Sequence, residues 1–325
     1  MTIPAPTTIT FPDRGDGPIT LSVLDQGQGP AVVFCHGFPE LAYSWRHQIP
    51  AVAEAGFRAV APDQRGYGGS SAPEAIEAYD IDALCGDIDQ LCEALGIERA
   101  VFVGHDWGGA VTWAMPTLHP ERVAGLVGIC TPMVAFPSTQ ALEQLVDGER
   151  DRMYMLWFQE PGVAEAFLDP RTRMVFEKLM VGGVDPAGAV EGMMSGGRLN
   201  MNPFLRIEDL RLAGEPVATP EELDVYVEAF EHTGFRGGIN WYRNLDRNRE
   251  LHPELCSKDP GVPCLMITAE WDPALPPWMS QGMPSMIEDL EMHMVQKAGH
   301  WVQQEHADEV NGVLVDWLTR RFGAS

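Results

Sequence analysis

The stretch that decides the fold runs from residue 101 to residue 109 and reads Val-Phe-Val-Gly-His-Asp-Trp-Gly-Gly. An apolar run ends in a central acid, Asp106, that is flanked at two positions on either side by Gly104 and Gly108. This pattern predicts a buried strand that turns sharply into a helix, because small residues at those positions permit a strained turn that lifts the central side chain out of the sheet. Taken alone, Asp106 could also be only the cap of a helix that begins at Trp107.

A carboxylate at this turn predicts the kind of electrophile that it attacks. A serine that attacked a saturated carbon would leave an ether, which is hard to hydrolyse, whereas a carboxylate leaves an ester that water can cleave. Asp106 therefore favours a substrate with an alkyl electrophile, either an epoxide or an alkyl halide. Esters and amides are disfavoured as substrates.

Two further residues stand where a nucleophile of this kind needs partners. Asp272 follows a late apolar run in Ala-Glu-Trp-Asp (269–272), and His300 follows the last apolar run in Gly-His-Trp (299–301). The chain order is nucleophile, acid, histidine. We expect His300 to act as general base on water, and Asp272 to fix its tautomer and stabilise the imidazolium. Glu270 is the competitor for the acid's role, and Asp272 is preferred.

An early strand ends in His-Gly-Phe-Pro (36–39). The backbone N–H of Phe38, together with that of Trp107, could form an oxyanion hole for the hydrolysis of the ester. The alternative is an ordinary turn, since glycine and proline end many strands.

The rest of the chain alternates between short apolar runs and helical patterns. Strands are expected over residues 19–24, 31–35, 59–61, 100–103, 262–268 and 290–295. Apolar residues recur at helical spacing from Ile81 to Leu95, and again from Val310 to Leu318. Short continuous strands that alternate with helices predict an α/β fold with a mostly parallel central sheet flanked by helices on both faces.

Residues 133–250 break this alternation. They are rich in Met, Glu and Gly, read as several helices joined by turns, and contain no convincing strand. We therefore expect an α-helical insertion between two halves of one sheet domain. The predicted division is residues 1–132 for the first part of the sheet domain, 133–250 for the helical insertion, and 251–325 for the second part.

Composition excludes several classes of function. The 325 residues carry 22 Lys+Arg against 47 Asp+Glu, a formal net charge of −25. Such a surface repels phosphate backbones and anionic lipids, which argues against nucleic acid and membrane partners. The N-terminal sequence is not that of a signal peptide, and apolar stretches such as 123–130 are far shorter than the ~20 residues of a membrane span.

The cysteines and the glycine-rich segment add two negative expectations. Cys85 and Cys92 lie seven apart on a predicted helix, hence ~10 Å apart and too far for a bridge. Six free thiols in a reducing cytoplasm are expected. The sequence has no HExxH or CxxC pattern, and the segment 65–70 lacks the phosphate-loop lysine and the dinucleotide spacing, so neither metal nor cofactor is expected.

Seven motifs in this order resemble the α/β-hydrolase-fold epoxide hydrolases of the soluble type, over nearly the whole chain. They are HGFP (36–39), RGYGGSS (65–71), GHDWGG (104–109), FQEPG (158–162), FRGGINWYRN (235–244), AEWD (269–272) and GHW (299–301). The resemblance implies that the helical insertion is the family's cap domain. The mammalian relatives carry an additional phosphatase-like domain, so a lipid-phosphate activity is not carried over.

The resemblance also implies that two cap tyrosines hold the epoxide oxygen and protonate it as the ring opens. Matched motif to motif, these are Tyr154, just before FQEPG, and Tyr242 in Asn-Trp-Tyr-Arg (240–243). Phenolic O–H groups suit this task, because the epoxide oxygen develops negative charge. Together with Phe38 and Trp107 they are also the expected substrate-binding residues. Tyr226 is left out because its neighbours match no motif.

The expected function is the conversion of an epoxide to a vicinal diol through a hydroxyalkyl ester of Asp106 that His300-activated water hydrolyses. The expected partners are a small epoxide and water, and the assembly state is open, with a homodimer as one option. A dehalogenase is the first alternative. Haloalkane dehalogenases commonly have Asn where Phe38 stands, and fluoroacetate dehalogenases need Arg where Trp107 stands. A non-catalytic binder on the same scaffold is the second alternative, but such proteins usually have damaged catalytic positions.

Overall fold

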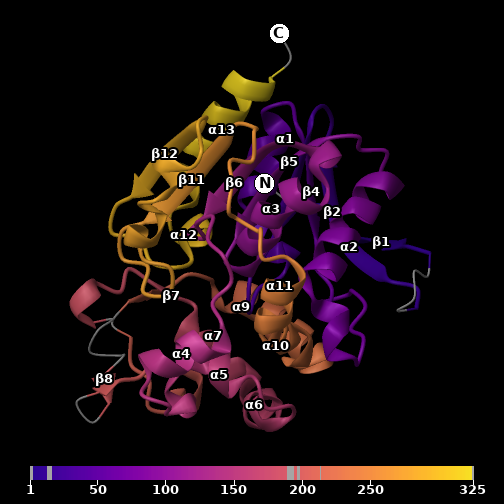
Figure 1. The fold of residues 1–325 in the computed structure, drawn as a ribbon. Coiled ribbons are helices and arrows are strands. Elements are labelled where there is room, and N and C mark those ends of the chain that lie inside the picture. Colours follow the sequence, from indigo (N-terminus) through magenta and orange to yellow (C-terminus); the bar gives the residue numbers. More distant parts are fainter. Residues whose placement is uncertain (1–2, 13–16, 189–193, 196–197, 213, 324–325) are drawn as a thin grey trace.

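The computed structural model describes residues 3–12, 17–188, 194–195, 198–212 and 214–323. An eight-stranded sheet forms its centre, with the strand order β1-β2-β4-β3-β5-β6-β11-β12 (Figure 1). β1 and β2 are antiparallel to each other, β2 is antiparallel to β4, and the other neighbours are parallel. The strands are β1 Thr7–Thr10, β2 Thr20–Gly27, β3 Ala31–Cys35, β4 Arg58–Pro62, β5 Ala100–His105, β6 Val123–Ile129, β11 Cys264–Ala269 and β12 Leu290–Val295.

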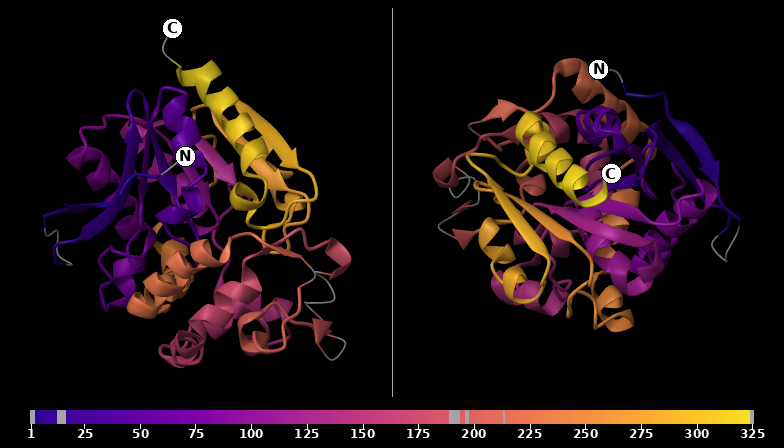
Figure 2. Two further views of the ribbon diagram at one scale, coloured as in Figure 1. Left: turned by 180° about the vertical axis from the view of Figure 1, so that it is seen from behind. Right: turned by 90° about the horizontal axis from the view of Figure 1, so that it is seen from above.

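Helices cover both faces of this sheet (Figure 2). Alternate side chains of the central strands point to opposite faces, so Phe34 packs with α1 and α13, while Val33 packs with α2 and α3. The helices are α1 Gln48–Glu54, α2 Ile81–Ala94, α3 Trp107–Leu118, α12 Val302–Glu305 and α13 Ala307–Phe322. The expected mostly parallel sheet with helices on both faces is thus confirmed.

The predicted strands agree with the structure to within a few residues. β1 and β6 are not among them, although β6 lies within the apolar stretch 123–130. β1 is a four-residue edge strand whose side chains are mostly exposed. A strand of this kind has no buried face and therefore no apolar alternation to detect.

The segment 133–250 forms a group of helices at the carboxyl ends of the parallel strands, below the sheet in Figure 1. Its helices are α4 Thr139–Leu145, α5 Tyr154–Trp157, α6 Val163–Leu168, α7 Thr172–Leu179, α9 Pro220–Thr233, α10 Arg236–Arg243 and α11 Leu245–Leu251. One-turn 3-10 helices in the described chain are η1 Ala42–Trp45, η2 Ile76–Tyr79, η3 Pro120–Arg122, η4 Arg150–Arg152, η5 Asp169–Arg171, η6 Phe204–Arg206, η7 Pro277–Ser280 and η8 Met283–Ser285.

The expectation that this segment contains no strand is wrong in detail. β7 (Val181–Gly182) pairs with β10 (Glu215–Pro216), and β8 (Met194–Ser195) pairs with β9 (Arg198–Leu199). Each of these strands has only two residues, which is too short to produce an alternating pattern in the sequence.

Two further features bear on the expectations from composition. All six cysteines are free thiols, and five of them are buried. Among the residues that the structure describes, no helix is long and apolar enough to cross a membrane.

Candidate active site

Asp106 stands at the turn between β5 and α3, with a backbone φ of 50° and ψ of −121°. This conformation is strained for a residue with a side chain. Glycines make room for it: a Cβ on Gly104 would overlap the carbonyl oxygen of Gly108, and a Cβ on Gly108 would overlap that of Cys35. A Cβ on Gly37 would collide with the Asp106 side chain itself. The turn therefore presents a carboxylate above the end of the sheet.

The two oxygens of Asp106 have different surroundings. Oδ1 accepts a hydrogen bond of 2.8 Å from the backbone N–H of Phe38. Oδ2 lies 3.7 Å from Nε2 of His300. Trp107 begins helix α3, so its N–H has no carbonyl acceptor in a preceding turn of the helix. The hydroxyl of Thr131 donates to the Asp106 carbonyl at 2.7 Å and secures the turn from below.

His300 and Asp272 form a hydrogen-bonded pair beside Asp106. Nδ1 of His300 lies 2.9 Å from Oδ2 of Asp272, and Oδ1 of Asp272 accepts from the N–H groups of Ala274 and Leu275 at 2.8 and 2.9 Å. Burial alone would raise the pKa of Asp272, but the charge and hydrogen bond of His300 outweigh it and lower that pKa to about 2. The competitor Glu270 instead accepts from the N–H of Lys297.

The charge state of His300 follows from the same neighbours. Burial would lower its pKa, but the charge and hydrogen bond of Asp272, followed by the charges of Asp106 and Glu40, raise it to about 9. The ring is therefore an imidazolium when both neighbouring carboxylates are charged. Neutralising Asp106 by ester formation would remove one of the causes that raise this pKa.

Behind the pair lies a fully buried charged group, Glu40. Its Oε2 accepts from the N–H of Gly37 at 2.9 Å and from Nδ1 of His105 at 2.7 Å. The other ring nitrogen of His105 lies 2.8 Å from the carbonyl oxygen of His300. The His105 ring thus bridges two acceptor oxygens, one of Glu40 and one of the His300 backbone. The electrostatic interaction and hydrogen bond with His105 outweigh burial and lower the pKa of Glu40 to about 2.

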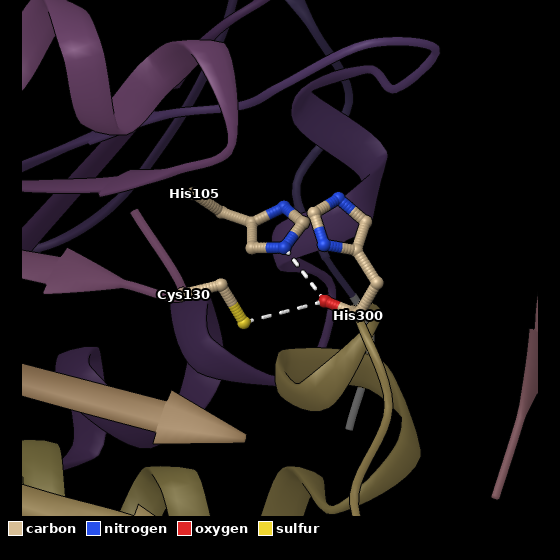
Figure 3. Close-up of side chains that lie close together, drawn as sticks. All are labelled: His105, Cys130 and His300. Carbon is tan, nitrogen blue, oxygen red and sulfur yellow. Dashed lines mark hydrogen bonds between the residues drawn. The ribbon is translucent and has the colours of Figure 1, made fainter. Parts of the chain in front are cut away.

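Figure 3 shows His105, Cys130 and His300 close enough together to raise the question of a metal site. The His105 ring and the Cys130 thiol, however, both point at the carbonyl oxygen of His300, at 2.8 and 3.5 Å. Burial raises the pKa of Cys130 well above its usual value, so the thiol keeps the proton that a metal would displace. These contacts fit a hydrogen-bonded support for the histidine's backbone better than a ligand set.

A second group of acidic and imidazole side chains lies far from Asp106. Asp89, His119 and Glu121 could approach one metal ion. Asp89 is already paired with Arg122 at 2.7 Å, and the guanidinium charge would oppose a cation there.

The segment 133–250 contributes Tyr154 and Tyr242, which line the same cavity as Asp106. Their ring centroids are 5.5 Å apart, in an edge-to-face arrangement. Both rings pack against Phe158, at 5.6 and 5.2 Å between centroids. Burial and the charge of Asp106 raise the pKa of Tyr154, while burial and the charges of Tyr154 and Asp106 raise that of Tyr242. The two phenols therefore keep their protons and can donate.

Tyr226, which matched no motif, lies elsewhere. Its hydroxyl is 2.9 Å from that of Ser44 and 3.1 Å from Oε1 of Gln304. Arg46, which is buried, reaches the same Gln304 oxygen at 2.7 Å and Glu222 at 2.7 Å. Tyr226 therefore takes part in a buried polar network that joins helix α9 to the sheet domain.

A cavity of about 220 Å³ brings these groups together. Its polar lining consists of Asp106, His300, the two tyrosines and Asn200, and the other lining side chains are apolar, except for the indole N–H groups of its tryptophans. Among the described residues that line it, none is Lys or Arg. Apolar side chains of both the sheet domain and the segment 133–250 form its walls.

The site contains residues that the sequence analysis missed: Glu40, His105, Thr131 and Cys130 support it from below. Glu40 directly follows the motif 36–39, and His105 lies within the motif 104–109. For His105 the available signal was an imidazole at the end of an apolar strand, and for Glu40 it was an acidic residue directly after the motif 36–39. Thr131 and Cys130 carried no such signal, because hydroxyl and thiol groups are common in buried strands.

Comparison with known proteins gives a consistent result. A family model described as the alpha/beta hydrolase fold matches residues 30–183. Epoxide hydrolase A of Mycobacterium tuberculosis (strain ATCC 25618 / H37Rv) is 45% identical over 314 residues, which cover 93% of this chain and 94% of the relative. The crystal structure of epoxide hydrolase A from Mycobacterium thermoresistibile has a TM-score of 0.85 at 42% identity, covering 97% of this chain and 98% of that chain.

A mammalian relative is longer. Bifunctional epoxide hydrolase 2 of Rattus norvegicus is 40% identical over 307 residues, which cover 92% of this chain and 53% of the relative. The chain therefore spans about half the length of this relative, and the likeness concerns that half.

Proposed function

Because this chain belongs to the epoxide hydrolases of the alpha/beta hydrolase fold, we propose that Asp106 is the nucleophile that opens the epoxide ring. Its Oδ2 attacks a ring carbon, and the carbon–oxygen bond on the opposite side breaks. The departing oxygen takes its proton from Tyr154 or Tyr242, whose phenols are held protonated by burial. The product of this step is a hydroxyalkyl ester of Asp106.

In the second step water cleaves the ester. Once Asp106 is an ester its negative charge is gone, so His300 releases its proton more readily. That proton replaces the one that the tyrosine gave to the epoxide oxygen. The neutral ring, held by Asp272, then takes a proton from water. Water adds to the ester carbonyl, whose oxygen is the Oδ1 that already accepts from Phe38, with Trp107 as the second donor. When this intermediate collapses, the bond between the carboxyl carbon and the alkoxide oxygen breaks, and the alkoxide takes the proton that His300 holds. The vicinal diol leaves, and Asp106 returns a proton to His300 and is again a carboxylate.

The observation that carries this proposal is the unequal environment of the two Asp106 oxygens. Oδ1 is bonded to a backbone N–H at 2.8 Å, while Oδ2 lies nearer the ring of the proposed base, at 3.7 Å. One oxygen is thus prepared to become the ester carbonyl, and the other to attack.

A single turnover in ¹⁸O-water tests the covalent route. The diol receives its oxygen from Asp106, so the label enters the Asp106 peptide and not the first equivalent of diol. Mass spectrometry of both products measures this. Label in the first diol with none in the peptide would show direct attack by water and refute the proposal. In His300→Gln the ester accumulates, because the base of the second step is missing.

We further propose that residues 133–250 act as a cap that closes over the substrate, and that the substrate is a neutral epoxide with apolar substituents. The cavity walls and the lack of Lys or Arg among the described lining residues support this. Two epoxides that differ only in whether they carry a free carboxylate or its methyl ester test the proposed preference for neutral substrates. The substrate with the methyl ester is expected to have the higher kcat/KM. The free thiols support a reducing compartment such as the cytoplasm.

A further inference from the structure

Glu305, the last residue of the one-turn helix α12, was assigned no role by the sequence analysis, yet its carboxylate is placed next to the proposed base. Oε1 accepts from the backbone N–H of Trp301 at 2.9 Å, and Oε2 accepts from that of Gly299 at 2.9 Å. These are the two residues that flank His300. One carboxylate therefore binds the peptide groups on both sides of the histidine.

The same carboxylate also binds the segment 133–250. Oε2 accepts a third hydrogen bond, of 3.1 Å, from the N–H of Gly183. Close by, Nε1 of Trp301 donates to the carbonyl of Leu179 at 2.7 Å. The loop that carries His300 is thus joined to the cap segment 179–183 at two points, and Glu305 supplies one of them.

Two glycines show how closely this carboxylate packs. A Cβ on Gly182 would lie 2.5 Å from Cδ of Glu305, and a Cβ on Gly299 would lie 3.0 Å from its Oε1. A side chain at Gly182 would displace the carboxylate, and one at Gly299 would press against it. The backbone N–H groups of Gly183, Gly299 and Trp301 thus form an anion-binding site, here called the cradle, and the anion bound there is the carboxylate of Glu305.

We propose that Glu305 is a positioning residue for the hydrolysis of the ester: it fixes the backbone of the His300 loop and fastens the cap segment 179–183 to it. This inference rests on the proposed roles of Asp106 and His300. Asp272 orients the His300 ring and His105 binds its carbonyl, whereas Glu305 binds the flanking N–H groups. Asp106 itself is held by Phe38 and Thr131, without Glu305, so ring opening does not depend on it.

The test is Glu305→Gln, assayed on an epoxide that the wild-type protein turns over. An amide has one acceptor oxygen and an NH₂ group that cannot accept, so at most part of the cradle survives. Misplacement of the base lowers kcat by on the order of 10²-fold. Because ring opening is spared, KM falls together with kcat, kcat/KM stays within about twofold, and the Asp106 ester becomes visible by mass spectrometry.

A purely structural role gives a different outcome. A smaller active fraction would lower kcat without changing KM and without accumulating ester, and this result would overturn the proposal, as would unchanged kinetics. Glu309→Gln is the matched control, because it removes the same charge from a carboxylate of the next helix that contacts His293 instead. Glu305→Asp, which keeps the charge, is expected to recover part of kcat.

Hydrogen exchange provides a readout that needs no substrate. In Glu305→Gln, the amides of the peptides that cover 181–184 and 299–301 exchange faster than in the wild-type protein, and both change together. Unchanged exchange in either peptide would overturn the proposed coupling. If the wild-type protein fails to hydrolyse any epoxide, the proposed function is wrong, while the exchange result still decides whether Glu305 fastens these two segments.

Discussion

The two halves of the site are held in place by different forces. Asp106, His300 and Asp272 stand at the carboxyl ends of strands, and short hydrogen bonds to backbone groups and charges fix each of them. Tyr154 and Tyr242 stand in the cap segment, where edge-to-face packing of aromatic rings holds them. Hydrogen bonds to charges lose strength steeply with angle and distance, whereas ring packing tolerates small shifts.

This difference matches the role that we propose for each half. In the proposed mechanism the strand-end half forms and breaks covalent bonds to one carbon atom, which needs exact distances. The cap half would bind an oxygen whose position varies with the substrate. We therefore expect substitutions in the strand-end half to lower the activity more than substitutions in the cap half. We also expect the loss to depend less on the substrate.

The largest effect is expected for Asp106→Ala. Without the carboxylate no ester forms, and kcat falls by about 10⁴-fold or more. Diol formation with an apolar epoxide measures it. Asp316→Ala, which removes an exposed carboxylate paired with Arg320, is the control and leaves kcat unchanged. Activity of Asp106→Ala within tenfold of wild type would mean that the cap half alone carries the reaction.

The next largest effect is expected in the cap half. Tyr154→Phe and Tyr242→Phe each lower the rate of ring opening by about 10- to 10²-fold, and the double variant by ~10³-fold, because one donor partly replaces the other. Stopped-flow measurement of ester formation gives these rates, with Tyr43→Phe as control. If one single variant loses as much of the ring-opening rate as the double variant does, only one of the two tyrosines acts as the donor.

A third expectation concerns pH and the stability of the strand-end half. The pKa of His300 is raised to about 9, above its ordinary value of 6.5, so the folded protein binds this proton more tightly than the unfolded chain does. The resulting stabilisation is present below pH 6.5 and is lost as the pH rises to 9, by up to about 3 kcal/mol. Urea unfolding at pH 6 and 9.5 measures it. His300→Gln should lose clearly less stability over this range, and an equal loss in both proteins would contradict the assignment.

The smallest effect is expected for Thr131→Val. This change keeps the shape but removes the hydroxyl that donates to the carbonyl of Asp106. Two backbone N–H groups of α3 also contact that carbonyl, so the loss in unfolding free energy is only about 1 kcal/mol. Urea unfolding measures it, with Thr233→Val at the end of α9 as control. A loss above about 3 kcal/mol would show that the turn depends on this one bond.

The sequence predicts the strand-end half well because its geometry is local. Asp106 needs glycines at fixed offsets, and a residue that follows a parallel strand necessarily arrives at the same sheet edge as the others. The amino-acid sequence alone was therefore enough to place the motifs around Phe38, Asp272 and His300 at one edge of the sheet.

The cap half could not be placed in this way. Nothing in the local spacing around Tyr154 or Tyr242 points to a site, and both were assigned through resemblance to a family. The support by Glu40 and Glu305 also escaped prediction, because one partner of each lies far away in the sequence, His105 for Glu40 and Gly183 for Glu305. Contacts of this kind depend on how segments pack in three dimensions, and no periodicity of the chain encodes them.

Phe38 belongs to both halves at once. Its N–H donates to Oδ1 of Asp106, while its ring packs edge-to-face against Phe158, Phe235 and Tyr242 of the segment 133–250. The cap is therefore not an exchangeable module. A chimaera that combines this sheet domain with the cap of another hydrolase must supply a matching set of rings around Phe38. Otherwise the Phe38 ring moves, and the backbone N–H of Phe38 moves with it. Substitutions meant to change the substrate range are therefore expected to be tolerated best at positions of the segment 133–250 that leave this contact intact.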